Sequence, residues 1–154
     1  MHMRHKSLVG LIIVVVAVLA CTCIGAVYIV DKSNDPLIEQ DGGTYSETVS
    51  LGNMAPGEEY AVHYTADGGV GSAFNVRVSG GEAGSLSDYV TIAVNVNGEN
   101  VYTGTYADCA ETGVSCSVSG KFDFDVIFML DASVGNEAQG LACEIITEYS
   151  LEGD

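Results

Sequence analysis

Few side chains of this chain could carry acid–base or metal chemistry. His63 is the only histidine beyond residue 5, and because it alternates with Val62 and Tyr64 it faces away from the apolar side of a predicted strand. The chain contains neither a His-Glu-x-x-His zinc motif nor a Gly-x-Ser-x-Gly nucleophile elbow. We therefore expect His63 to be an ordinary surface residue of a sheet, and we predict no catalytic residue.

Asp123 and Asp125 are a carboxylate pair whose spacing could serve chemistry. Two residues apart on a strand, their side chains share one face at a separation of roughly 6–7 Å. That separation is compatible with a shared calcium ion or with glycosidase-like carboxyl groups. A straight strand supplies neither a glycine turn nor a third oxygen donor, so we expect a solvated strand face, with Asp123 and Asp125 as calcium candidates. No cofactor is predicted.

Three of the five cysteines lie beyond the apolar N-terminal segment. The stretch CAETGVSC, from Cys109 to Cys116, has the shape of a hairpin tip with Thr112 and Gly113 at its turn, which predicts a disulfide between the two cysteines in an exported protein. Cys143 lies on the apolar face of an alternating stretch and is expected to be a buried, unpaired small hydrophobe. No Cys-x-x-Cys pair occurs, so a zinc site is not predicted.

The N-terminal segment decides where the rest of the chain resides. Leu8 to Val30 is an uncharged run, longer than the ~7–15 apolar residues of an ordinary secretory signal and long enough to span a bilayer as a helix of ~20 residues. This favours a transmembrane anchor. The alternatives are a signal cleaved after Ala26 and a lipid attached to Cys21. Arg4 and Lys6 precede the run, which places the N-terminus in the cytoplasm.

Anchor and signal both export the remainder of the chain, which is strongly acidic. All 21 acidic residues lie in that part, against three basic residues, Lys32, Arg77 and Lys121. Such a surface repels phosphate groups and anionic lipids, so nucleic-acid binding is not predicted. The expected partners are the membrane, through Leu8 to Val30, and other copies of the chain. The expected location is a single-pass membrane protein with its C-terminal domain outside, or a secreted protein after cleavage.

The pattern of apolar residues predicts one all-β domain over residues 45–154. It follows a short cytoplasmic N-terminus and the transmembrane or signal-anchor helix, which together cover residues 1–30, and a linker over residues 31–44. Apolar and polar residues alternate with period two, and Asn97-Gly98 suits a tight hairpin turn. The predicted strands cover residues 44–51, 58–66, 72–80, 90–96, 101–106, 121–130 and 140–151, with another around residue 116. So many strands predict an antiparallel sandwich of two sheets, with Phe124 and Val94 buried between them.

Three stretches of the chain resemble the TasA/camelysin-like family of exported β-sandwich proteins, which includes biofilm-fibre and cell-surface subunits. They are SLGNMAPGEEY at Ser50 to Tyr60, LSDYVTIAVNVNGENVYTGT in the middle, and NEAQGLACEIITEYSL at Asn136 to Leu151. The resemblance covers residues 45 to 151. It implies a jelly-roll-like sandwich, a structural corner at Pro56 and Gly57, and subunits that link by donating an N-terminal strand.

Together these features predict a non-enzymatic surface protein that presents an acidic β-sandwich outside the membrane for adhesion or envelope structure. The alternative is a processed fibre subunit of a biofilm or pilus-like assembly. In that case cleavage after Ala26 would free Val27 to Val30, an apolar tetrapeptide rich in β-branched residues, to fill a groove in the next subunit. A retained helix would prevent that release. The two functions therefore differ in whether the peptide bond after Ala26 is cleaved.

Overall fold

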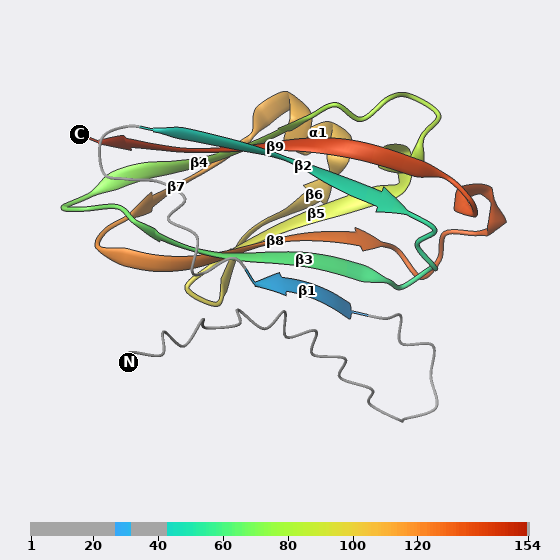
Figure 1. Cartoon of the computed structure of the whole chain (residues 1–154), viewed down its shortest axis with the longest axis horizontal. Helices are drawn as coiled ribbons and strands as arrows, with labels where there is room; N and C mark the ends of the chain where they lie inside the picture. The colour runs from blue at the N-terminus through green and yellow to red at the C-terminus, as the bar shows by residue number, and fades with distance from the viewer. Residues whose placement is uncertain (1–26, 32–42, 154) are drawn as a thin grey trace, which may run out of the picture.

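The computed structural model describes residues 27–31 and 43–153, which form a two-layered β-sandwich (Figure 1). The predicted helix up to Ala26 and most of the predicted linker lie outside the described residues. The strands are β1 (Val27–Asp31), β2 (Thr44–Gly52), β3 (Glu59–Asp67), β4 (Ser72–Ser79), β5 (Val90–Val96), β6 (Glu99–Thr105), β7 (Val114–Val118), β8 (Lys121–Leu130) and β9 (Ala142–Gly153). The short helices are η1 (Leu86–Tyr89), α1 (Tyr106–Thr112) and η2 (Asn136–Ala138).

One sheet has the strand order β2-β9-β4-β7, and the other has the order β1-β3-β8-β5-β6. From β2 to β9, every connection except the β5–β6 hairpin passes from one sheet to the other. Eight antiparallel strands arranged in this way form a jelly roll, to which β1 is added at one edge. The predicted two-sheet architecture is therefore confirmed.

β1 corrects the predicted bounds of the N-terminal helix. Val27–Asp31 is a strand, so the helix that was predicted to end at Val30 does not include these residues, and the strand pairs with β3 in parallel register. The register places Tyr28 beside Tyr60 and Val30 beside Val62. β-Branched residues favour an extended strand, and pairing with β3 satisfies the backbone hydrogen bonds on one side of β1. These two effects explain why the end of the apolar run forms a strand and not the end of a helix.

The core between the sheets is built by the inward side chains of each alternating strand. Phe124 and Val94 are fully buried, as predicted. Along β8 every second residue from Phe122 to Leu130 is buried, which is the period that a strand with one dry face requires. Asn97 and Gly98 both have positive φ, 51° and 80°, so the predicted primed hairpin turn joins β5 to β6.

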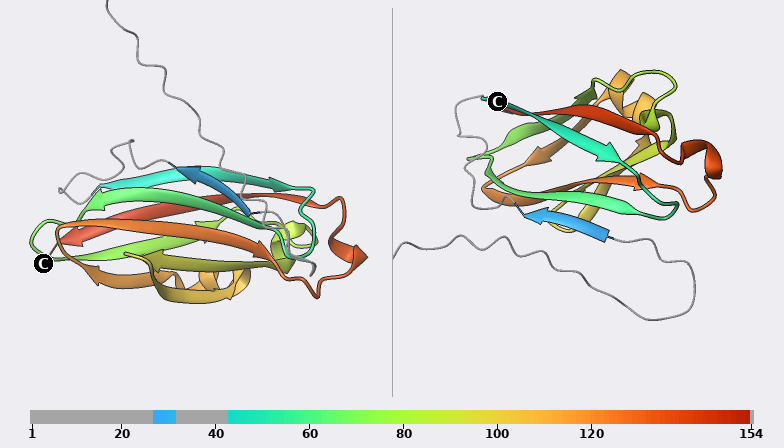
Figure 2. Two further views of the ribbon diagram at one scale, coloured as in Figure 1. Left: turned by 90° about the horizontal axis from the view of Figure 1, so that it is seen from below. Right: turned by 45° about the vertical axis from the view of Figure 1, so that its right-hand side comes forward.

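The predicted hairpin between Cys109 and Cys116 is wrong, because Tyr106–Thr112 forms the helix α1. The side chain of Thr105 caps its first turn by accepting a hydrogen bond from the Asp108 amide (3.1 Å), and Gly113 ends it with φ +66°. α1 packs against β4 of one sheet and β5 and β6 of the other, on the side of the sandwich away from β1 (Figure 2). The helix therefore closes one side of the jelly roll.

Pro56 and Gly57 lie in the corner where the chain passes from β2 in one sheet to β3 in the other. The Glu58 amide donates to the Ala55 carbonyl (2.9 Å), and Gly57 has φ +84°. Proline at the second position and a positive φ at the third are typical of a type II turn. The Gly57 amide then donates to the Leu130 carbonyl (2.7 Å), which fixes the corner to the end of β8. None of the helices in residues 27–31 and 43–153 has the length and apolarity needed to cross a membrane.

Candidate binding cleft

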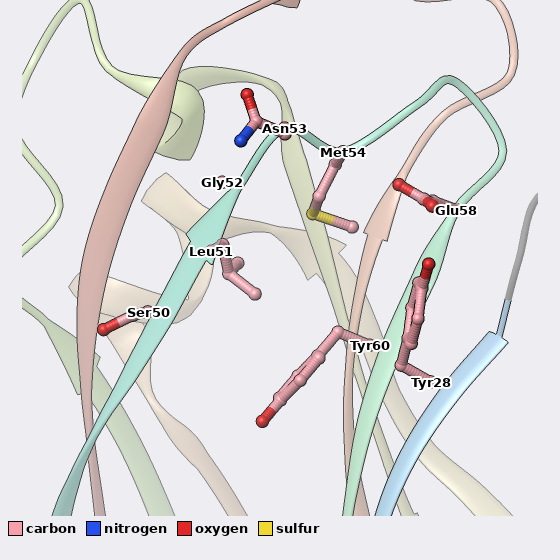
Figure 3. Close-up of a pocket in the computed structure, with 8 residues that line it drawn as sticks. All are labelled: Tyr28, Ser50, Leu51, Gly52, Asn53, Met54, Glu58 and Tyr60. Carbon is pink, nitrogen blue, oxygen red and sulfur yellow. The ribbon is translucent and has the colours of Figure 1, made fainter. Parts of the chain in front are cut away.

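A cleft of about 370 Å³ lies between the edges of the two sheets (Figure 3). β1 lines it, so it lies on the side of the sandwich away from α1 (Figure 2). β2 forms one wall as the last strand of its sheet, and β1 and β3 form the other wall. Its lining includes two tyrosines, a carboxylate, an amide and two apolar side chains: Tyr28, Tyr60, Glu58, Asn53, Leu51 and Met54. The cleft thus combines aromatic, apolar and anionic surfaces.

The parallel pairing of β1 with β3 brings the two tyrosines together. Tyr28 and Tyr60 are register partners, and paired residues of neighbouring strands point to the same face of the sheet. Tyr60 is half-buried and its ring lies 6.5 Å from that of Phe128, whereas Tyr28 is 51% exposed. Tyr60 is therefore a supported wall of the cleft and Tyr28 forms its outer rim.

The corner after β2 positions the carboxylate. Glu58 accepts a hydrogen bond from the Ala55 amide through Oε2 (2.5 Å), and its own carbonyl accepts from the Leu130 amide (3.0 Å). These bonds hold the first residue after the Pro56-Gly57 turn at the end of the cleft. Figure 3 shows the Glu58 carboxylate at the same end of the cleft as Met54.

A second aromatic group continues inside the sandwich from the same edge. The rings of Tyr45 and Tyr149 stack at 6.2 Å, and Tyr64 donates a hydrogen bond from its hydroxyl to Glu47. Tyr64 and Tyr149 are fully buried, and burial raises the pKa of Tyr149 far above its ordinary value. Tyr149 therefore stays neutral, and its ring packs the core beneath β2.

The outer face of the β1-containing sheet carries the side chains that sequence analysis singled out for chemistry. His63 Nδ1 lies 2.6 Å from Asp125 Oδ1, and the Thr65 hydroxyl donates to Asp123 (2.8 Å). The two calcium candidates therefore each contact a side chain of β3. Within the part of the chain that the structure describes, no three His, Cys, Asp or Glu side chains gather as a metal site would require. No hydrogen bond joins His63 to a serine there.

The three cysteines beyond residue 26 are unbonded, so the predicted disulfide between Cys109 and Cys116 is absent from the structure. Cys109 lies in α1 and Cys116 in β7, because a helix replaces the hairpin that would have joined them. Burial raises the pKa of the Cys109 thiol to about 11. Cys143 is buried in β9, as expected. The thiols are therefore packing groups in this fold.

Sequence analysis did not find the cleft, although it named the corner that bounds it. Tyr28 lies in the run that predicts a helix, and nothing local to Tyr60 distinguishes it from other inward residues of a strand. The signal available in the sequence was the β-branched run next to Ala26, which favours a strand as well as a helix end.

Comparisons with known proteins show a similarity of fold and no match in sequence. No model of a known protein family matches it, and no curated protein matches its sequence. Its fold is similar to that of PliG from Aeromonas hydrophila, a periplasmic inhibitor of g-type lysozyme, with 10% identity, a TM-score of 0.49, and coverage of 82% of this chain and 97% of that one. PliG from Salmonella Typhimurium has 8% identity and a TM-score of 0.45, over 80% of this chain and 97% of that one. These values assign no function.

Proposed function

We propose that this chain is a non-enzymatic protein of the cell exterior, whose acidic β-sandwich serves adhesion or envelope structure. The uncharged run that begins at Leu8 supports export, and the excess of 21 acidic over 5 basic residues supports a highly solvated, extracytoplasmic surface. The polar groups that most resemble catalytic ones also have structural partners: His63 contacts Asp125, and Asp123 accepts from Thr65.

The observation that carries this proposal is the position of β1. The strand begins at Val27, within the last residues of the uncharged run, and is hydrogen-bonded to β3 at the edge of the sandwich. Leu8 to Ala26 still offers 19 uncharged residues, within the range of ~17–25 that spans a bilayer. A retained segment would therefore hold the sandwich close to the membrane surface, with β1 joining anchor and domain.

A second candidate, a fibre subunit that assembles by strand donation, is favoured by the same strand. β1 starts at the residue after the predicted cleavage site at Ala26, and among the described strands it pairs with β3 alone. Its Tyr28 and Ile29 are 51% and 53% exposed, whereas Val30 packs against the core. Such a strand could leave its own sheet and occupy the same edge of a neighbour. Membership of the TasA/camelysin-like family belongs to this proposal.

The two candidates are separated by sequencing the N-terminus of the mature protein and measuring its partition on carbonate washing. The anchored protein should keep residues before Val27 and stay in the membrane fraction, because burial of an apolar helix in lipid is insensitive to charge screening. The fibre subunit should begin at Val27 and appear outside the cell. An Ala26→Leu variant tests the cut, because a bulky residue blocks cleavage at that site, and Ala17→Leu within the apolar run is its matched control. A mature protein found in the cytoplasm with its full N-terminus would refute both candidates.

A further inference from the structure

We propose that the cleft between β1 and β2 binds an extended, basic segment of another protein, which adds to the edge of β2 and places a lysine or arginine side chain against Tyr28, Tyr60 and Glu58. This inference goes beyond the proposed function, because it assigns a ligand class to a site. It rests on the lining of the cleft, on the edge beside it, and on charge.

The lining of the cleft suits a cation on an apolar stem. Tyrosine rings attract ammonium and guanidinium groups through their π faces, and a nearby carboxylate adds a charge-assisted hydrogen bond. Tyr28 and Tyr60 supply two rings and Glu58 supplies the carboxylate. Leu51 and Met54 supply apolar surface for the methylene groups of a long basic side chain. The volume of about 370 Å³ is sufficient for one such side chain.

The edge of β2 offers a backbone to which an extended segment can pair. In the described part of the chain β2 has a strand neighbour on one side only, β9. Its residues Ser50 to Gly52 line the cleft on the other side. Peptides that add to such an edge gain affinity from main-chain hydrogen bonds, and a pocket beside the edge selects alternate side chains. The cleft lies where that pocket is needed.

Charge determines which kind of segment fits. The protein carries 21 acidic against 5 basic residues, and neither Arg77 nor Lys121 lines the cleft. These two residues instead have acidic register partners in their own sheets, Glu148 and Asp67. No basic residue of the described part of the chain complements Glu58, and the excess of acidic residues favours a cationic occupant over a second copy of the chain at this cleft. The acidic charge of the chain therefore favours a basic segment of a different protein as the occupant.

The test is fluorescence anisotropy with the full chain in a non-ionic detergent and a labelled hexapeptide of alternating lysine and valine. We expect saturable binding that weakens as salt is raised, and no binding of the same peptide with glutamate in place of lysine. Methylating the backbone nitrogens of the lysine peptide should abolish binding, because edge pairing needs those donors. Equal binding of the glutamate or methylated peptide would overturn the proposal, as would the absence of any binding.

Two variants and one matched control locate the site. Glu58→Gln should weaken binding about tenfold. Glu59→Gln removes one negative charge from the face of β3 opposite to Tyr60, and it should change binding by less than about twofold. Tyr28→Leu removes an aromatic face from the exposed strand β1 and should also weaken binding, which keeps the test valid if Glu58→Gln disturbs the corner. Equal losses in the Glu58 and Glu59 variants would show nonspecific attraction and refute the site.

Discussion

Phe124→Ala is the substitution that tests the packing of the sandwich most severely. Phe124 is fully buried on β8, and it lies at the centre of the aromatic core that joins the two sheets. Its ring centroid is 4.6 Å from that of Phe74, 5.0 Å from Tyr64, 5.2 Å from Tyr149 and 5.9 Å from Phe122. Removing the ring leaves these four neighbours facing a cavity.

The expected loss in the free energy of unfolding is about 4–5 kcal/mol. Truncating a buried phenylalanine costs about 3–5 kcal/mol through lost apolar burial and the residual cavity. The upper part of that range applies because each aromatic pair contributes ~0.5–1.5 kcal/mol beyond its buried area. A loss of this size is a large fraction of the ~5–15 kcal/mol that stabilises a typical domain.

The assay is equilibrium unfolding in urea, followed by far-ultraviolet circular dichroism because the chain has no tryptophan. Ile146→Ala is the matched control, since Ile146 is 40% exposed on β9 and should cost less than about 1 kcal/mol. The reasoning is refuted if Phe124→Ala costs less than about 1 kcal/mol with an unchanged dependence on urea, or if the control costs as much.

Three further predictions concern the corner and the thiols. Gly57→Ala should destabilise the fold by about 1 kcal/mol or more, because φ +84° is unfavourable for a residue with a Cβ. The midpoint of urea unfolding measures this loss, and an unchanged midpoint would contradict the turn. Peptide mapping of unreduced, denatured protein should find all three cysteines beyond residue 26, Cys109, Cys116 and Cys143, alkylated, whereas a disulfide that joins any two of them would contradict the structure. The pKa of Cys109 is raised from 9.0 to about 11, so the unfolded thiol ionises first and the free energy of unfolding should fall as pH rises from 9.0 to about 11; Cys109→Ala should lessen that fall.

The sequence predicted the fold correctly where a strand has one buried face and one solvent-exposed face. The inward residues of β8, from Phe122 to Leu130, are an example, because period-two alternation marks both the strand and its buried side. The turn at Asn97-Gly98 was predictable because few residues accept positive φ. These features depend only on neighbours along the chain.

The features that the sequence did not predict depend on distant parts of the chain or on short signals. Val27 to Val30 belongs to an apolar run that fits a membrane helix, and only pairing with β3 makes it a strand. α1 is too short to show a helical period, although Thr105 and Gly113 carried its capping signals. The cleft forms because Tyr28 of β1, Tyr60 of β3 and Glu58 of the corner lie close together in the fold. No local sequence pattern predicts that proximity.

The most direct test of the proposed role of β1 is a disulfide engineered between Ile29→Cys and Ala61→Cys, which are register partners in β1 and β3. Paired strands bring Cα atoms within the ~4.4–6.8 Å that a disulfide spans, so oxidation should join the two positions. The anchored protein should give a bond within one chain, which on a non-reducing gel leaves its mass unchanged. A fibre built by strand donation should give a ladder of covalently linked chains that collapses on reduction. The absence of any bond between these positions, in monomer and in assembly, would contradict the pairing of β1 with β3 on which both candidates depend.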